Sequence, residues 1–254
     1  DSPGFLGNRV GVFAMQVAMT EAIKMKLSIE EADAVFGRPM GIPKTGVFGL
    51  YDLIGIDLMK DVLASFKKEL QDDDPFMEVV RPHPIVEELL DKGYTGNKGP
   101  GGFYENKIID GDETIKALKI SDMSYYDFDK VDLPIARIVE KEGMKALLDD
   151  DSDYGKYVFA VLSKIINYCA FCIPEVSSKI TDIDDAIRMG FNWNEGPFEL
   201  LFEYGLEKYI HRLQDEGIEV PNLFTTMMRL KQDPYDSTSS RAYNHEAGMK
   251  FINR

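Results

Sequence analysis

The sequence predicts an all-α protein, and three observations carry this prediction. Apolar residues recur at helical spacing along most of the chain, and one helical pattern occurs twice. The strict alternation of half-buried strands is nearly missing, apart from short possibilities around Phe103 and Ile108. We therefore expect two tandem copies of one helical domain, packed against each other as a pseudo-dimer.

The first helix is expected to begin near Phe5, after a short loop. Gln16, Thr20 and Lys24 recur every four positions, whereas almost every other residue from 10 to 25 is apolar. A helix with so narrow a polar stripe should be buried around most of its circumference.

The next two helices have recognisable boundaries. Ser28 is a typical N-cap, and Glu31, three residues later, completes a capping box. The segment 37–43 contains glycine and proline and should end this helix. Another helix is expected to start near Gly46 and to be interrupted at Gly55.

An internal repeat follows from matches at an offset of 150 residues. The string GVFGL at 46–50 recurs as GPFEL at 196–200, and Gly55 matches Gly205. Upstream, ADAV at 32–35 pairs with DDAI at 184–187 after a slip of two residues.

Each copy of this pattern is preceded by a long apolar helix, and this completes the predicted repeat. The expected domains are residues 1–110, residues 111–151 as an acidic linker or extension, and residues 152–254 as a second, degenerate copy. Because the second copy keeps its packing residues, it should cover the apolar face of the first copy within one chain. We therefore expect a monomer with an internal pseudo-twofold.

The charge of the chain restricts its partners. The formal net charge is −15, which argues against nucleic acid or anionic lipid as the main partner. Residues 105–153 hold 14 acidic and 7 basic residues, a net charge of 7 − 14 = −7, typical of a solvated surface or linker.

The cysteines and the apolar runs favour a cytoplasmic protein without a membrane partner. Cys169 and Cys172 stand alone within an apolar helical run and are expected to be core residues in a reducing compartment. That run is short for a membrane span and contains Lys164 and Asn167. The first twelve residues do not have the pattern of a signal peptide.

The candidate site residues each have a structural and a functional interpretation. Asn8, at the start of the first helix, is either a cap or satisfied polar group, or a functional residue. The glycine-rich segment 93–104 is either a plain turn or a binding loop; its spacing is not that of a Walker A motif, and a helix over 85–91, not a strand, precedes it. His83, His211 and His245 lie in no triad or metal-binding pattern, and no metal site is predicted.

Taken together, three motifs resemble the C-terminal region of the 3-hydroxyacyl-CoA dehydrogenases, in the long form found in multifunctional fatty-acid oxidation proteins. They are DSPGFLGNR at 1–9, GIPKTGVFGLYDLIGID at 41–57 and KGPGGFY at 98–104. A degenerate second copy, GFNWNEGPFEL, lies at 190–200.

The resemblance implies roles for two residues. Asn8 matches the family asparagine beside the reacting carbon, whose amide N–H can donate to the C3 oxygen. Lys98 matches a lysine that reaches toward the NAD cofactor, although Gly99 and Pro100 depart from the usual residues there. The helices between Leu27 and Leu63 should form a wall for the acyl chain.

The resemblance also implies what this chain does not contain. In the family, a Rossmann domain with the NAD fingerprint and a catalytic His–Glu pair precedes the first motif, and neither is found in this sequence. We therefore expect a fragment of a β-oxidation dehydrogenase that acts on acyl-CoA and is inactive without the missing domain. Two alternatives are a non-catalytic helical docking module and a dehydrogenase of small hydroxy acids.

Overall fold

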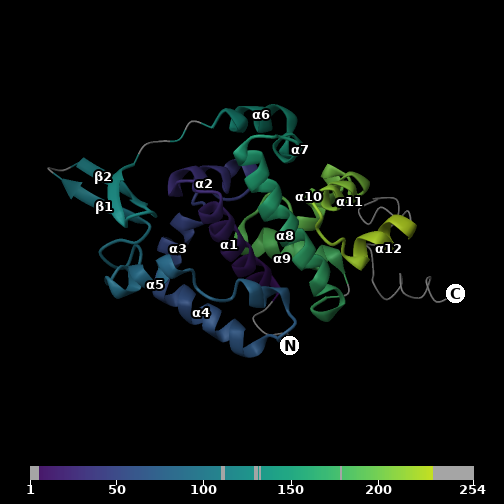
Figure 1. The fold of residues 1–254 in the computed structure, drawn as a ribbon, viewed down its shortest axis with the longest axis horizontal. Coiled ribbons are helices and arrows are strands. Elements are labelled where there is room, and N and C mark those ends of the chain that lie inside the picture. The colour runs from purple at the N-terminus through teal and green to yellow at the C-terminus, as the bar shows by residue number, and fades with distance from the viewer. Residues whose placement is uncertain (1–5, 110–111, 129–130, 132, 178, 231–254) are drawn as a thin grey trace. The chain divides into compact units, whose positions relative to one another are not determined.

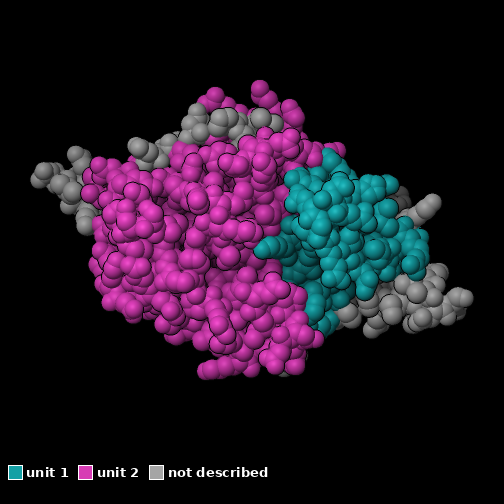
Figure 2. All heavy atoms as spheres, viewed as in Figure 1, with its two compact units in different colours: residues 1–11, 162–254 teal, residues 12–161 magenta. Residues whose placement is uncertain are grey.

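The computed structural model describes residues 6–109, 112–128, 131, 133–177 and 179–230. The chain divides into two compact units (Figure 2): unit 1 comprises residues 1–11 and 162–254, and unit 2 comprises residues 12–161. Helices α1 and α8 each contribute residues to both units. Each unit is described by itself.

The described residues are mostly helical (Figure 1). The N-terminal elements are α1 (Leu6–Lys24), α2 (Ile29–Val35), η1 (Arg38–Met40), α3 (Phe48–Ile54), α4 (Ile56–Glu69), η2 (Pro75–Glu78) and α5 (Pro84–Asp91). Strands β1 (Tyr104–Ile109), β2 (Asp112–Lys119) and β3 (Ser124–Asp127) and helices α6 (Pro134–Glu142) and α7 (Met144–Leu148) follow. The remaining helices are α8 (Asp153–Glu175), α9 (Ile180–Phe191), α10 (Pro197–Tyr204), α11 (Leu206–Asp215) and α12 (Asn222–Leu230).

Helix α1 is buried around most of its circumference, as predicted. Its polar stripe is partly an internal contact, because Gln16 is also buried. The Gln16 amide donates to the carbonyl of Val79 at 2.8 Å, and its oxygen accepts from the hydroxyl of Tyr51 at 2.5 Å. Burial of an amide is tolerated where both its donor and its acceptor find partners.

The predicted boundaries of α2 and α3 are confirmed. Ser28 and Glu31 form the full capping box, with Glu31 N–H donating to Ser28 Oγ and Ser28 N–H donating to the Glu31 carboxylate. Helix α3 ends at Gly55, whose φ of 106° and ψ of 123° interrupt the helix before α4 begins. A left-handed φ of this kind suits glycine, because other residues meet steric strain there.

The three-stranded antiparallel sheet, ordered β1-β2-β3, corrects the all-α prediction. It lies within the acidic stretch, where charged residues masked the strand pattern. Among the described side chains of β2, only Ala117 and Leu118 are buried. The sheet is fastened to helix α2, since the hydroxyl of Tyr126 donates to the Glu30 carboxylate at 2.6 Å. Tertiary contacts therefore stabilise strands that have little apolar pattern of their own.

The stretch expected to be a linker or extension is folded over much of its length. Besides β2 and β3 it holds α6 and α7, and Met144, Leu147 and Leu148 of α7 are buried. The stretch is therefore highly charged overall but contributes apolar side chains to the protein core. A count of net charge does not reveal these buried residues.

One helix junction in each unit has the same local geometry. Gly205, between α10 and α11, has a φ of 102° and a ψ of 115°, close to the values at Gly55. Phe198 N–H, at the start of α10, donates to Asp184 of α9, as Phe48 N–H donates to Asp33 of α2. By role Asp184 therefore matches Asp33, one residue away from the register inferred from the sequence, which paired Asp184 with Ala32.

Helix α8 is longer than the apolar run suggested. By length and composition the segment Asp153–Ile173 could cross a membrane, with a mean hydropathy of 1.4, but 72% of that window is buried. Such burial is typical of a core helix. Cys169 and Cys172 are buried free thiols on this helix, as expected.

Candidate functional site

Asn8 is the third residue of α1, and its side chain is exposed. It lies inside the first turn and not at the N-cap position, so the capping interpretation does not fit. The first backbone N–H groups of a helix lack partners within the helix and carry partial positive charge. The side-chain amide of Asn8 therefore adds a hydrogen-bond donor to the helix start, where a ligand oxygen with partial negative charge is favoured.

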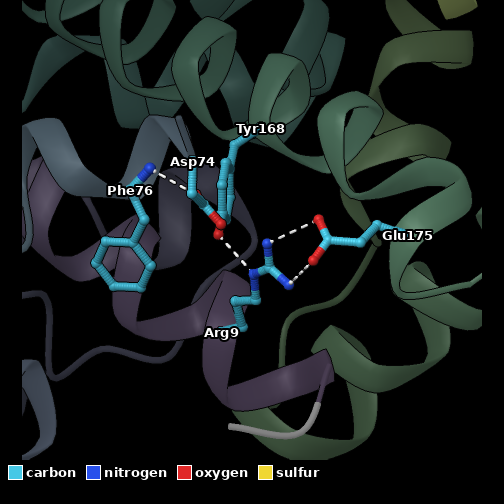
Figure 3. A network of polar contacts seen from close by, with 5 residues as sticks. All are labelled: Arg9, Asp74, Phe76, Tyr168 and Glu175. Carbon is cyan, nitrogen blue, oxygen red and sulfur yellow. Dashed lines mark hydrogen bonds and ion pairs between the residues drawn. The ribbon is translucent and has the colours of Figure 1, made fainter. Parts of the chain in front are cut away.

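Arg9, the next residue, is fully buried, and Figure 3 shows its guanidinium between Tyr168 and Glu175 of unit 1. Its Nε donates to the Tyr168 hydroxyl at 2.8 Å, and its two terminal nitrogens donate to the two carboxylate oxygens of Glu175, each at 3.2 Å. Burial lowers the pKa of Arg9, but the hydrogen bonds that Arg9 donates to Glu175 and Tyr168 outweigh this and keep its pKa above the usual range. The guanidinium is therefore a fixed cation with bonds to both partners.

The bend in α8 explains how Glu175 reaches Arg9. Ile173 has non-helical angles (φ −96°, ψ 123°) and precedes Pro174, which disfavours the helical conformation in the residue before it. The chain turns at this point, and Glu175 follows directly. Asp74 and Phe76, also drawn in Figure 3, belong to unit 2, where the Asp74 carboxylate accepts from Phe76 N–H at 2.8 Å and caps η2.

The first turns of α1 lie close to α9 within unit 1. A Cβ atom added to Gly11 would overlap the ring of Phe191, and one added to Gly7 would lie 3.3 Å from the carbonyl oxygen of Ala186. Two glycines four residues apart thus bring the helix start against α9, while Arg9 points to α8. Asn8 occupies the remaining exposed side.

The glycine-rich segment of unit 2 is a turn built on Asp52 of α3. The Asp52 carboxylate accepts from Phe103 N–H at 2.9 Å and from Tyr104 N–H at 2.7 Å. A Cβ atom at Gly102 would overlap this carboxylate, and Gly96 pairs with Gly101 across the turn. The glycines therefore allow close backbone approach.

Lys98, at the tip of this turn, forms an ion pair with Asp57 at 2.5 Å. Asp57 lies in the first turn of α4, and the hydrogen bond from Lys98 holds the pKa of Asp57 below its usual value. A Cβ atom at Gly55 would lie 2.7 Å from Lys98 Nζ. The lysine is about half exposed and lies above the α3–α4 junction.

A cavity of about 390 Å³ lies beside the turn in unit 2. Asp33 and Asp52 line it, and burial raises the pKa of each to about 7. Asp33 accepts from Phe48 N–H, Gly49 N–H and the hydroxyl of Tyr104. Because these carboxyl groups are engaged with the backbone, they stabilise the helix starts and the turn around the cavity.

Sequence reasoning identified Asn8 and Lys98 but missed the residues that support them. Lys98 is brought together with Asp57 in unit 2, whereas Asn8 lies in unit 1 beside Arg9. Asp52 could have been found from the sequence, because an acidic residue within an apolar helix indicates a buried polar contact. No sequence pattern indicates Tyr168 and Glu175 as partners of Arg9, because they lie 159 and 166 residues from it.

The histidines have structural or unassigned roles. The Nδ1 of His83 accepts from Ile85 N–H at 3.3 Å and caps α5, and burial lowers its pKa. His245 lies outside the described residues. Within the part of the chain that the structure describes, no three His, Cys, Asp or Glu residues gather in a way that could hold a metal ion.

Comparison with known proteins places these features in a family. Residues 4–106 match the family model described as "3-hydroxyacyl-CoA dehydrogenase, C-terminal domain". A protein of Rickettsia prowazekii, named as a fatty acid oxidation complex trifunctional enzyme, is 35% identical over 100% of this chain, which spans 35% of that protein. One of Bacillus subtilis, named as a 3-hydroxyacyl-CoA dehydrogenase, is 28% identical over 99% of this chain and 31% of its own length.

A solved structure supports the fold. The crystal structure of 3-hydroxybutyryl-CoA dehydrogenase from Escherichia coli matches 90% of this chain and 60% of its own chain, with a TM-score of 0.60 and 20% identity. The chain spans about a third of the length of the relatives from Rickettsia prowazekii and Bacillus subtilis. It carries, in residues 4–106, a member of the 3-hydroxyacyl-CoA dehydrogenase C-terminal domain family.

Proposed function

We propose that this chain is the C-terminal, substrate-side part of an NAD-dependent dehydrogenase of fatty-acid β-oxidation, which oxidises 3-hydroxyacyl-CoA to 3-oxoacyl-CoA. The observation that carries the proposal is the exposed Asn8 on the first turn of α1, beside the buried Arg9. An amide donor held on a rigid helix end can stabilise the oxygen on C3 as it becomes a carbonyl.

We infer that the cofactor is bound mainly by a domain other than this one. The sheet of the described residues is antiparallel and holds no strand–glycine loop–helix unit of the kind that binds a pyrophosphate. Lys98 could supply one cationic contact to an anionic cofactor, and NAD, when held by a separate domain, would supply the hydride acceptor. We therefore expect the chain alone to be inactive and to bind NAD weakly. Isothermal calorimetry checks this, and micromolar NAD binding by the isolated chain would contradict it.

Activity can be tested by joining this chain to the segment that precedes the matched region in the Rickettsia prowazekii relative. The fusion should oxidise NADH in the presence of acetoacetyl-CoA, followed at 340 nm. Asn8→Ala should lower kcat roughly a hundredfold with an unchanged melting temperature, because one oxyanion donor contributes about 3 kcal/mol. Asn194→Ala, an exposed asparagine elsewhere in unit 1, is the matched control. Equal kinetics for the two variants would remove Asn8 from the chemistry.

The acyl chain is proposed to lie along the α3–α4 junction of unit 2. Leu53 is 60% exposed and Leu58 is 48% exposed, on either side of Gly55 and close in sequence to the partner of Lys98. Exposed leucines next to a cation suit a substrate with an apolar chain and an anionic head. Leu53→Gln should raise KM more for a long-chain than for a four-carbon substrate. Met189→Gln, at a residue of unit 1 that is 79% exposed, should change neither.

We propose also that residues 1–110 and 152–254 are two copies of one helical domain and that the chain is a monomer. The matched roles of Asp33 and Asp184, and the matched angles of Gly55 and Gly205, support this. Light scattering on the whole chain should give the mass of one chain, whereas a stable dimer would contradict the proposal.

A further inference from the structure

The start of α1 is held from two sides by residues that follow position 161. Gly7 and Gly11 lie against α9, and Arg9 binds Tyr168 and Glu175 of α8. All of these residues belong to unit 1. The turn that carries Asn8 is therefore anchored by the part of the chain that has none of the family's site motifs.

The Arg9 contacts define the rotation of this turn about the helix axis. The guanidinium is planar, and its fork meets both oxygens of Glu175 while Nε meets the Tyr168 hydroxyl. Its carbon also lies 5.9 Å from the centroid of the Tyr168 ring. Bidentate pairs restrict direction as well as distance. Because Arg9 has no exposed surface, water cannot easily replace these bonds if the turn rotates.

The position of Asn8 depends on that rotation. Successive residues of a helix are about 100° apart around its axis, so the direction of Arg9 determines the direction of Asn8. Helix ends otherwise fray, because their first N–H groups lack partners. A catalytic amide on a fraying turn would spend much of its time away from the reacting oxygen.

We propose that Tyr168 and Glu175, acting through Arg9, are positioning residues that hold Asn8 at the C3 oxygen of the substrate. The degenerate second copy would thereby contribute to the reaction without the Asn–Arg pair and the glycine-rich segment of the first copy. This inference rests on the proposed function for its catalytic part, whereas the anchoring of the turn can be measured without any activity.

The first measurement is hydrogen–deuterium exchange of the whole chain. Tyr168→Phe and Glu175→Gln should each speed exchange of the backbone amides at residues 10–14 about tenfold or more, because the anchored turn opens more often. Two controls remove similar contacts elsewhere in unit 1. Tyr209→Phe removes a buried hydroxyl bonded to Ser163 and Asn167, and Glu216→Gln removes the negative charge that pairs with Arg212. Unchanged exchange in the Tyr168 and Glu175 variants overturns the inference.

The second measurement is the kinetics of the fusion protein. Each positioning variant should lower kcat between about tenfold and a hundredfold with KM within twofold, because small displacements of a catalytic group have effects of this size. In an Asn8→Ala background the same variants should cause no further loss, since the group they position is absent. A loss that persists in that background would indicate a purely structural role and overturn the inference.

Failure of the proposed function has a different signature. A folded fusion of native sequence without activity contradicts the proposed function and, with it, the catalytic part of this inference. The exchange measurement then still decides whether Arg9 anchors the turn. Glu175→Gln keeps the experiment informative if Tyr168→Phe folds poorly, because Glu175 is about half exposed and isosteric with glutamine.

Discussion

The α3–α4 junction of unit 2 and the α10–α11 junction of unit 1 have the same backbone geometry but different surroundings. A Cβ atom at Gly55 would meet Lys98 and Asp57, whereas one at Gly205 would meet nothing closer than Lys208, at 3.8 Å. The angles alone demand glycine at both positions. The difference shows that the backbone geometry of the junction does not require the ion pair of Lys98 with Asp57. This ion pair is present beside Gly55, and Gly205 has the same geometry without a contact this close at its added Cβ atom.

The largest expected difference concerns Asp33 and Asp184, whose carboxylates accept from the backbone at the starts of α3 and α10, the helices that lead into these junctions. Asp33 also binds the hydroxyl of Tyr104 in the sheet, and the described part of unit 1 has no such strand. Asp33→Ala should lower the free energy of unfolding by roughly 3 kcal/mol, because it leaves several buried donors unsatisfied. Asp184→Ala should cost about half as much. Urea unfolding measures both, and equal losses would show that the sheet contact adds nothing.

The glycines come next. Gly55→Ala and Gly205→Ala should each cost roughly 1–2 kcal/mol, because both force a residue with a side chain into a strained backbone region. Only Gly55→Ala should also displace Lys98 from Asp57. NMR of the Asp57 carboxyl would detect this as a pKa that returns toward its usual value. An unchanged Asp57 signal in Gly55→Ala would mean that the turn adjusts without strain.

The pH dependence of stability provides a separate test of the turn beside Gly55. Burial raises the pKa of Asp52 to about 7 in the folded protein, against about 3.9 when unfolded. The folded state thus binds this proton more tightly, so its contribution is complete below about pH 4 and is lost as the pH rises through 7. Asp52→Asn should reduce the fall in unfolding free energy between pH 5 and pH 8. Parallel curves for variant and native chain would exclude Asp52 as the source.

The smallest effect is expected for the charged turn itself. Lys98→Ala should leave the melting temperature unchanged, because exposed ion pairs contribute little to stability. It should raise the pKa of Asp57, which Lys98 now holds low. Lys92→Ala, which removes the exposed partner of Glu88, is the control for the loss of one positive charge. A clear loss of stability in Lys98→Ala alone would indicate that the turn is part of the scaffold.

Local signals in the sequence predicted much of the helical framework. The capping box of Ser28 and the break at Gly55 depend on residues a few positions apart, so their physics is contained in short strings. The sheet was not predicted, because its strands are held by contacts such as that of Tyr126 with Glu30, 96 residues away in sequence. The register of Asp184 inferred from the sequence differs by one residue from the pairing by hydrogen-bonding role, because matching letters do not reveal which residue accepts from the next helix.

The sequence by itself determined the helical class of most elements, the family of residues 4–106 and the identity of Asn8 and Lys98 as candidate site residues. Only the tertiary structure decided that an acidic stretch forms a sheet, that Asp52 carries the glycine-rich turn, and that Arg9 is bound by Tyr168 and Glu175. Periodicity and caps report interactions within one turn or one helix. The partners of a buried guanidinium are the groups that lie near it in space. Residues more than 150 positions apart become neighbours only after the chain has folded.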